Sequence, residues 1–157
     1  MNYNTVTGTH FASMDDLVPL FEERLAGGQK VRFRPKGISM QPMLRHDTDF
    51  VTLSALSADP QKYDIVLYRR DNGKYVLHRI VGVGKTYTMI GDNQYVREQG
   101  IRRDQIIAVV TSFTRSDREY SMDSLIQKIY CRVWHFTRFP RRILRAVKYR
   151  VIRIFKK

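Results

Sequence analysis

Short segments of alternating apolar and polar residues, separated by turn signals, fill the chain from Lys30 to Phe113. Alternation places successive side chains on opposite faces of a strand, so it predicts half-buried β-structure. Without long helices between them, such strands favour a mainly β fold: a compact, antiparallel, partly closed β-barrel-like domain. Six strands are expected, at residues 31–35, 49–56, 64–70, 74–83, 86–91 and 105–113.

One turn within this region has a specific sequence signal. Asn72-Gly73 lies between the segments DIVLYRR and YVLHRIV. Asn-Gly accepts the positive φ angles of a two-residue hairpin turn, so it predicts that these two segments pair as a β-hairpin.

Helical patterns flank the β-region on both sides. Residues 13–28 have Ser13 and Asp16 in capping-box positions and end at a pair of glycines, with an expected buried stripe of Leu17, Leu20, Phe21 and Leu25. From about Met122, apolar residues recur every three or four positions. Because proline breaks or kinks a helix, Pro140 should divide this part into helices at about 122–138 and 141–155.

The net charge of +13 is concentrated at one end of the chain. Residues 121–157 hold 11 Lys or Arg and one acid, which gives +10, whereas the first 120 residues carry only +3. We therefore expect three parts: an N-terminal segment with a short helix (1–29), a β-domain (30–115) and a basic amphipathic helical tail (116–157).

Several protein classes are disfavoured by composition. Cys131 is the single cysteine, which excludes an internal disulfide and leaves too few thiolates for a zinc site. The apolar runs are far shorter than the ~20 residues that cross a bilayer. The first ten residues resemble no signal peptide, so we expect a cytoplasmic protein.

Ser39 in KGISMQP and His78 in YVLHRIV are candidates for a nucleophile and its base. A serine needs a base to accept its proton, and a rigid strand suits an imidazole with that role. A turn serine and a structural strand histidine are the alternatives. The segment MIGDNQYVREQG supplies Asp92 and Glu98, either of which could orient the histidine or be a solvated acid.

The order of these segments resembles the serine peptidases of the type I signal peptidase family. The resemblance covers about residues 31–112, and three motifs carry it: Ser39-Met40-x-Pro42, His78-Arg79 and Gly91-Asp92-Asn93. A histidine at the base position is typical of the family's endoplasmic-reticulum-like branch. In that branch a later acid completes a triad, and the matching position here is Glu98.

This resemblance implies a catalytic role for Ser39, His78 and Glu98, with Asp92 as a possible second acid, and no metal or organic cofactor. It implies that Gly37, Met40 and Pro42 bind substrate or form the oxyanion hole, and that Gly91 and Asn93 shape a loop. Because Gly37 replaces a serine often found there, backbone N–H groups near Ser39 would stabilise the oxyanion alone. The expected substrate is an extended leader- or signal-peptide-like segment with small side chains before the scissile bond, bound by strand addition.

The tail allows three interpretations: binding to an anionic membrane surface at the inner face, nucleic-acid binding, or packing on its own domain. We favour the membrane, since each basic residue near such a surface contributes ~1 kcal/mol. For the whole protein the rival hypotheses are a relative of the self-cleaving repressor proteases, which use lysine as base, and a non-catalytic peptide-binding adaptor. A cytoplasmic peptidase for one peptide precursor is a third.

Overall fold

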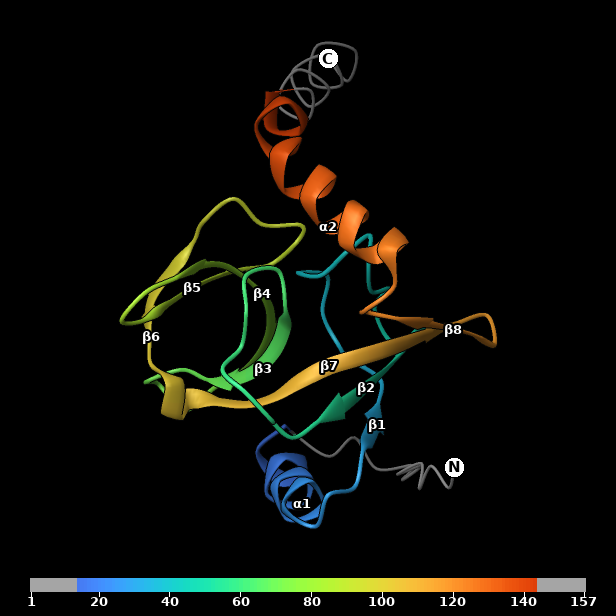
Figure 1. Cartoon of the computed structure of the whole chain (residues 1–157), viewed down its shortest axis with the longest axis vertical. Coiled ribbons are helices and arrows are strands. Elements are labelled where there is room, and N and C mark those ends of the chain that lie inside the picture. The colour runs from blue at the N-terminus through green and yellow to red at the C-terminus, as the bar shows by residue number, and fades with distance from the viewer. Residues whose placement is uncertain (1–13, 144–157) are drawn as a thin grey trace, which may run out of the picture.

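The structure is a computed structural model that describes residues 14–143. These residues form one eight-stranded antiparallel sheet, the helices α1 and α2, a short 3₁₀ turn and a helical segment at 138–143 (Figure 1). The strand order is β1-β2-β7-β3-β4-β5-β6, and β8 also pairs with β7. The expected mainly β, antiparallel class is therefore confirmed. The sheet is open, because no pairing joins β1 to β6 within the described part of the chain, so the expected partial closure into a barrel is not observed.

All six expected strands are present, and two further strands were not expected. The additional strands are short: β6 is Glu98–Ile101 and β8 is Arg118–Ser121. The expected strands, with slightly different ends, are β1 Val31–Phe33, β2 Phe50–Ser54, β3 Ile65–Arg69, β4 Tyr75–Val83, β5 Tyr87–Ile90 and β7 Ile106–Arg115.

The predicted hairpin joins β3 to β4. Gly73 has a φ of 82°, which glycine adopts without strain, and the N–H of Arg70 donates to the carbonyl of Lys74 at 2.9 Å. The register that follows pairs Val66 with His78 and Tyr68 with Val76. This register decides which side chains share a face of the sheet with His78.

Helix α1, Met14–Ala26, covers one end of the sheet. It buries Val18, Phe21 and Leu25 in a core cluster that also contains Leu53 and Leu67. The expected stripe was correct at Phe21 and Leu25, but Val18 is buried where Leu17 and Leu20 are half-buried. The proposed cap, Ser13, lies outside the described residues.

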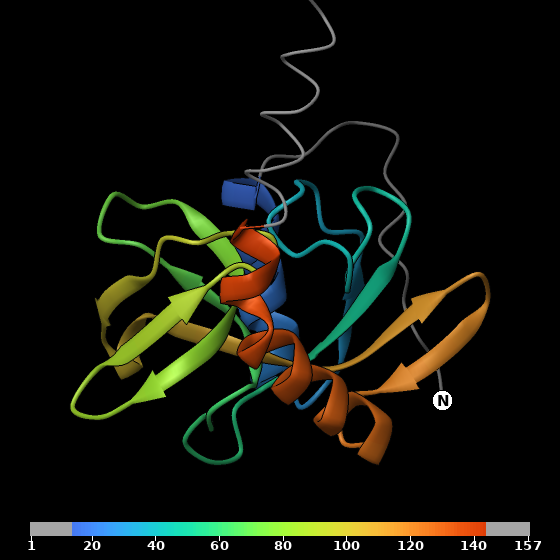
Figure 2. The same cartoon turned by 90° about the horizontal axis from the view of Figure 1, so that it is seen from above.

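Helix α2, Leu125–Phe136, lies over the opposite end of the sheet (Figure 1) and runs between the β4–β5 and β7–β8 hairpins (Figure 2). Ser124 caps it by accepting from the N–H of Gln127 at 3.3 Å. The helix is interrupted at Thr137, and residues 138–143 are helical again. Pro140 thus lies in the first turn of the second segment, where a missing N–H is tolerated, rather than at the break itself. The rest of the expected helix 141–155 lies outside the described residues.

The sheet extends beyond the boundary expected at residue 115. Strand β8 pairs with β7, with Phe113 opposite Tyr120 and the two rings stacked at a centroid distance of 5.0 Å. The segment 116–121 therefore belongs to the β-domain, and the helical part begins only at Leu125.

Candidate active site

Ser39 lies in a turn of the loop between β1 and β2. The residues that follow it in this turn are held by contacts with the rest of the domain. The side chain of Met40 is only 4% exposed and packs in the same core cluster as α1. The Gln41–Pro42 peptide bond is cis, and the carbonyl of Pro42 accepts from Arg115 Nη2 at 3.1 Å. Ser39 itself is half-buried, so its backbone is anchored while its side chain remains at the surface of the fold.

These positions change the roles expected for the residues around the serine. Met40 anchors the turn, and its buried side chain is not available to contact substrate. The N–H of Gly37 donates to His46 Nδ1 at 2.8 Å, so this group is already engaged and is not an oxyanion donor. Gly37 has a φ of 105°, and this left-handed conformation explains why the residue is glycine.

The Gly91-Asp92-Asn93 loop packs directly against the serine turn. The backbone N–H of Asn93 donates to the carbonyl of Ser39 at 2.8 Å, and its side-chain amide donates to the carbonyl of Ile38 at 3.1 Å. A Cβ added to Gly91 would lie 2.6 Å from the carbonyl oxygen of Ser39. Glycine is therefore required at position 91 for this close approach.

The same loop connects the serine turn to His78. Strand β4 pairs with β5 so that Arg79 is opposite Ile90, which places Gly91, the next residue, beside His78. Ser39 and His78 are therefore both neighbours of Gly91. Within residues 14–143 no hydrogen bond joins the Ser39 hydroxyl to His78, whose observed partners are Tyr68 and Glu98. Such bonds are often formed only when substrate binds.

His78 is almost completely buried, with 1% of its surface exposed, and its Nδ1 faces an acid. Glu98 Oε1 lies 3.3 Å from Nδ1, and the hydroxyl of Tyr68 lies 3.2 Å from the same nitrogen. A carboxylate at Nδ1 favours the tautomer with a proton on that nitrogen, which leaves the lone pair on Nε2. This is the arrangement that a serine's general base requires.

Glu98 is itself held by two residues that the sequence analysis did not select. Tyr68 donates its hydroxyl to Oε2 at 2.8 Å. Arg70 donates through Nε to Oε2 at 2.7 Å and through Nη2 to Oε1, forming a bidentate pair. The side chains of Tyr68, Arg70, His78 and Glu98 lie together on one face of the part of the sheet formed by β3 to β6.

The hairpin register contains the signal that could have identified both residues. Val66 is opposite His78, and side chains two positions apart on a strand share a face. Tyr68 and Arg70 therefore lie on the same face as His78. The Asn72-Gly73 turn predicts this hairpin, and its register, counted outward from His78, leads to both residues.

The surroundings of His78 and Glu98 lower the pKa of both side chains, for different physical reasons. Burial lowers the pKa of His78 from 6.5 to about 4, although the Glu98 carboxylate acts in the other direction. Burial would raise the pKa of Glu98, but hydrogen bonds from Arg70 and Tyr68 outweigh it and hold the pKa below its usual value. Near pH 7 the site therefore contains a neutral imidazole beside an ionised carboxylate.

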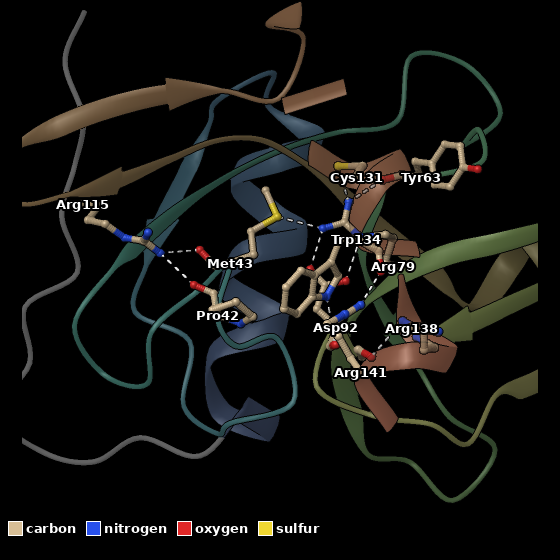
Figure 3. A network of polar contacts seen from close by, with 11 residues as sticks. Pro42, Met43, Tyr63, Arg79, Asp92, Arg115, Cys131, Trp134, Arg138 and Arg141 are labelled. Atoms are coloured by element: carbon tan, nitrogen blue, oxygen red, sulfur yellow. Dashed lines mark hydrogen bonds and ion pairs between the residues drawn. The ribbon is translucent and has the colours of Figure 1, made fainter. Parts of the chain in front are cut away.

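Asp92, the other candidate acid, has a different partner. Both of its oxygens accept from the guanidinium of Arg79, at 2.8 Å and 2.7 Å, and both side chains are fully buried (Figure 3). Arg79 also donates to the carbonyl of Tyr63 at 2.9 Å and contacts the sulfur atoms of Cys131 and Met43. Asp92 is thus a structural partner of Arg79, and Glu98 is the acid that contacts His78.

Helix α2 contacts this loop from the other side (Figure 3). The indole N–H of Trp134 donates to the carbonyl of Asp92 at 3.0 Å. Arg138 reaches the carbonyl of Gly91 at 3.5 Å. The loop that touches Ser39 is therefore held between the sheet and α2.

No protein-family model matches this chain, and a search of curated proteins finds no match. Within residues 14–143 there is no group of three side chains suited to hold a metal ion. The geometry of Ser39, His78 and Glu98 is therefore the basis for a functional proposal.

Proposed function

We propose that the protein is a serine endopeptidase in which Ser39 is the nucleophile, His78 the general base and Glu98 the acid that orients the base. One observation carries the proposal: Glu98 lies 3.3 Å from Nδ1 of a buried histidine whose neighbouring loop packs on the serine turn. The adaptor hypothesis assigns no function to this carboxylate, whereas the peptidase needs it to hold the imidazole in the tautomer with a free Nε2.

The proposed reaction is acyl transfer through a covalent intermediate. Ser39 Oγ attacks the carbonyl carbon of the scissile peptide bond while His78 Nε2 accepts the hydroxyl proton. The tetrahedral intermediate collapses when His78 returns that proton to the leaving amine, which gives an acyl-enzyme. A water molecule, activated by the same nitrogen, then hydrolyses the ester and restores Ser39.

The proposed substrate is an extended leader- or signal-peptide-like segment. Two features of the described residues support an extended ligand: the sheet has open edges at β1 and β6, and Ile38 and Val96 are 61% and 79% exposed near the serine turn and β6. An open edge can pair with a peptide backbone, and neighbouring apolar side chains can then select its residues.

A fluorophosphonate probe tests the nucleophile directly, because it forms a covalent bond only with an activated serine. We expect labelling of the wild-type protein at Ser39, none in Ser39→Ala, and labelling at least about a hundredfold slower in His78→Ala. Ser57→Ala is the matched control, since Ser57 is an exposed loop serine outside the site. Equal labelling of wild type and Ser39→Ala would exclude the proposed mechanism.

Substrates can be identified by comparing new protein N-termini in cells that carry wild-type protein or Ser39→Ala. Termini that disappear in the mutant would identify the cleaved peptides. A folded, expressed wild-type protein that produces no such difference and takes no probe would instead favour the non-catalytic adaptor.

A second candidate function, attachment to an anionic membrane surface at the inner face, is supported by the orientation of α2. The helix turns its more polar side toward the domain, where Gln127 and Cys131 are buried. Large apolar side chains of α2 and of the helical residues 138–143 that follow it are each at least half exposed: Leu125, Ile126, Ile129, Val133, Phe136, Phe139 and Ile143. Within residues 14–143 no helix has the length and apolarity needed to cross a bilayer. An exposed apolar stripe on a strongly basic segment suits the interface of an anionic membrane.

Val133→Gln tests this attachment against a closely matched control. Val133 on α2 and Val83 in the β4–β5 hairpin are both 55% exposed. We expect Val133→Gln to weaken partition onto vesicles of phosphatidylglycerol and phosphatidylcholine several-fold, while Val83→Gln leaves it unchanged. Equal partition of the two variants would remove this support for the membrane candidate.

A further inference from the structure

A basic and aromatic pocket of about 270 Å³ lies between the loop after Gly91-Asp92-Asn93 and the end of α2. None of the proposed catalytic side chains lines it. Three arginines and three aromatic residues form much of its wall: Arg97, Arg138, Arg142, Tyr95, Phe136 and Phe139.

The positive charge of this pocket is not balanced by the protein. No salt bridge within residues 14–143 includes Arg97, Arg138 or Arg142. All 15 Asp and Glu residues of the chain lie within that range, so no acidic side chain exists elsewhere to pair with them. Asp92 attracts the charge of Arg138, but both of its oxygens already accept from Arg79.

Polar atoms in the pocket wall also lack partners. Arg138 Nε and Nη1 and His135 Nδ1 are buried and have no hydrogen-bond partner among the described residues. Burial, together with the like charges of Arg141 and Arg97, lowers the pKa of Arg138. Unpaired donors and repelling charges are costly inside a fold, and a bound anion would offset both costs.

The rim of the pocket is apolar and exposed. Phe136, the last residue of α2, and Phe139, in the helical segment that follows it, are 74% and 70% exposed. Val96, which precedes Arg97, is 79% exposed. A small soluble anion would make no use of this rim, whereas an anionic lipid would place its phosphate among the arginines and its chains against the aromatic side chains.

We propose that this pocket binds the phosphate group of an anionic phospholipid and so fixes how the catalytic domain sits on the membrane. The proposal rests on the membrane-surface candidate function and names the ligand for it. Arg138 also contacts the carbonyl of Gly91. A lipid bound to Arg138 would therefore be linked through this one side chain to the loop that supports Ser39.

The test is a titration of the full-length protein with dihexanoyl phosphatidylglycerol, which stays monomeric in solution and requires no membrane surface. Trp134 is the single tryptophan, and Arg141 stacks on its ring at 3.3 Å, so its fluorescence reports on this end of α2. We expect a saturable change in wild-type protein and an affinity at least about tenfold weaker in Arg97→Gln/Arg142→Gln.

The control is Lys85→Gln/Arg118→Gln, which removes the same charge from two exposed positions in other hairpins and should bind as wild type does. Equal affinity in the two double variants would overturn the proposal. Inorganic phosphate that saturates the protein at the same concentration as the lipid would also overturn it, in favour of a soluble ligand. Tighter binding of acetyl-glutamate amide would assign the pocket to an acidic substrate residue instead. Because Ser39→Ala should give the wild-type titration, failure of the lipid site and failure of the peptidase proposal are separate results.

Discussion

The protonation of His78 affects both the proposed base and the stability of the fold. Burial lowers its pKa from 6.5 to about 4, so the folded protein binds fewer protons than the unfolded chain between those two values. The free energy of unfolding should therefore be highest above pH 6.5 and should decrease as the pH falls toward 4.

Urea unfolding at pH 7 and pH 5 measures this decrease. We expect a clear loss of stability at pH 5 in the wild type and a smaller loss in His78→Asn, which cannot be protonated there. Some loss should remain in the variant, because burial also lowers the pKa of His135. An equal loss in both proteins would mean that His78 is not held in its neutral form by the fold.

Arg70 is predicted to act as a positioning residue through Glu98. Arg70→Gln should lower kcat by about ten- to a hundredfold, with KM almost unchanged, because Glu98 would no longer be fixed beside His78. The Arg70 charge also lowers the pKa of His78, so the acid limb of the kcat/KM profile should move to higher pH in this variant.

Two further variants separate positioning from a loss of folding. Arg70→Lys keeps the charge and should restore the position of the acid limb, although it cannot form the bidentate pair. Arg69→Gln removes an exposed neighbouring arginine and should behave as the wild type. An unchanged pH profile in Arg70→Gln would contradict the positioning role.

At the scale of single elements, the hydrophobic pattern predicted strands well where one face is buried. The six alternating segments are strands, and the Asn72-Gly73 turn set the β3–β4 register. Strand β8 was missed because all four of its residues are exposed, and β6 because a single residue of its four, Ile101, is buried. Such strands are defined by backbone pairing to a neighbour, which leaves no periodic signal in the sequence.

The candidate site followed from local sequence signals only in part. Ser39, His78 and Glu98 each carried a local sequence signal, but the choice between Glu98 and Asp92 depended on which cation each acid meets. Arg79 binds Asp92 and Arg70 binds Glu98. Those pairings join residues 13 and 28 positions apart in the sequence, so only the tertiary structure distinguishes the two acids.

Gly91 provides a test of how closely the serine turn and the neighbouring loop must approach. Gly91→Ala places a Cβ 2.6 Å from the carbonyl oxygen of Ser39, so the two loops must separate. We expect a loss of about 1–3 kcal/mol in the free energy of unfolding and at least a tenfold loss in peptide cleavage. Urea unfolding and steady-state kinetics measure the two effects.

Gly84→Ala is the matched control for this substitution. Its added Cβ would lie 3.8 Å from the nearest atom, the carbonyl oxygen of Thr86, which is an ordinary contact. This variant should keep wild-type stability and activity. Wild-type activity in Gly91→Ala would show that the contact between the two loops does not support the site.

For the whole molecule, α2 packs against the β-domain and contributes contacts to its interior. It covers the buried Arg79–Asp92 pair with Cys131 and donates to the carbonyl of Asp92 through Trp134. The sequence predicts the helix and its basic character, but the periodic apolar residues do not by themselves indicate which side of the helix packs on the sheet. In the structure the polar side of α2 packs inward, because the charged pair beneath it needs polar partners.

Shortened chains should separate the two roles of the C-terminal region. A chain ending after Ile143 keeps every described contact of α2 with the loop at Gly91-Asp92-Asn93, so its unfolding midpoint in urea and its peptide cleavage should remain near those of the full chain. A chain ending after Ser124 loses Cys131 and Trp134 and exposes Arg79 and Asp92 to water. We expect it to unfold at lower urea and to lose at least about nine-tenths of its cleavage activity.

The same pair of chains decides between a detachable tail and an integral element. If the chain ending after Ser124 cleaved peptide as the full chain does, α2 would serve attachment alone, and the loop at Gly91-Asp92-Asn93 would hold its shape without it. The shortened chain could lose activity simply because it misfolds, so Trp134→Phe in the full chain is the control. It removes only the N–H that donates to the carbonyl of Asp92. This variant should lose about 1 kcal/mol of stability and show a measurable fall in kcat, since the loop it releases is the one that contacts Ser39.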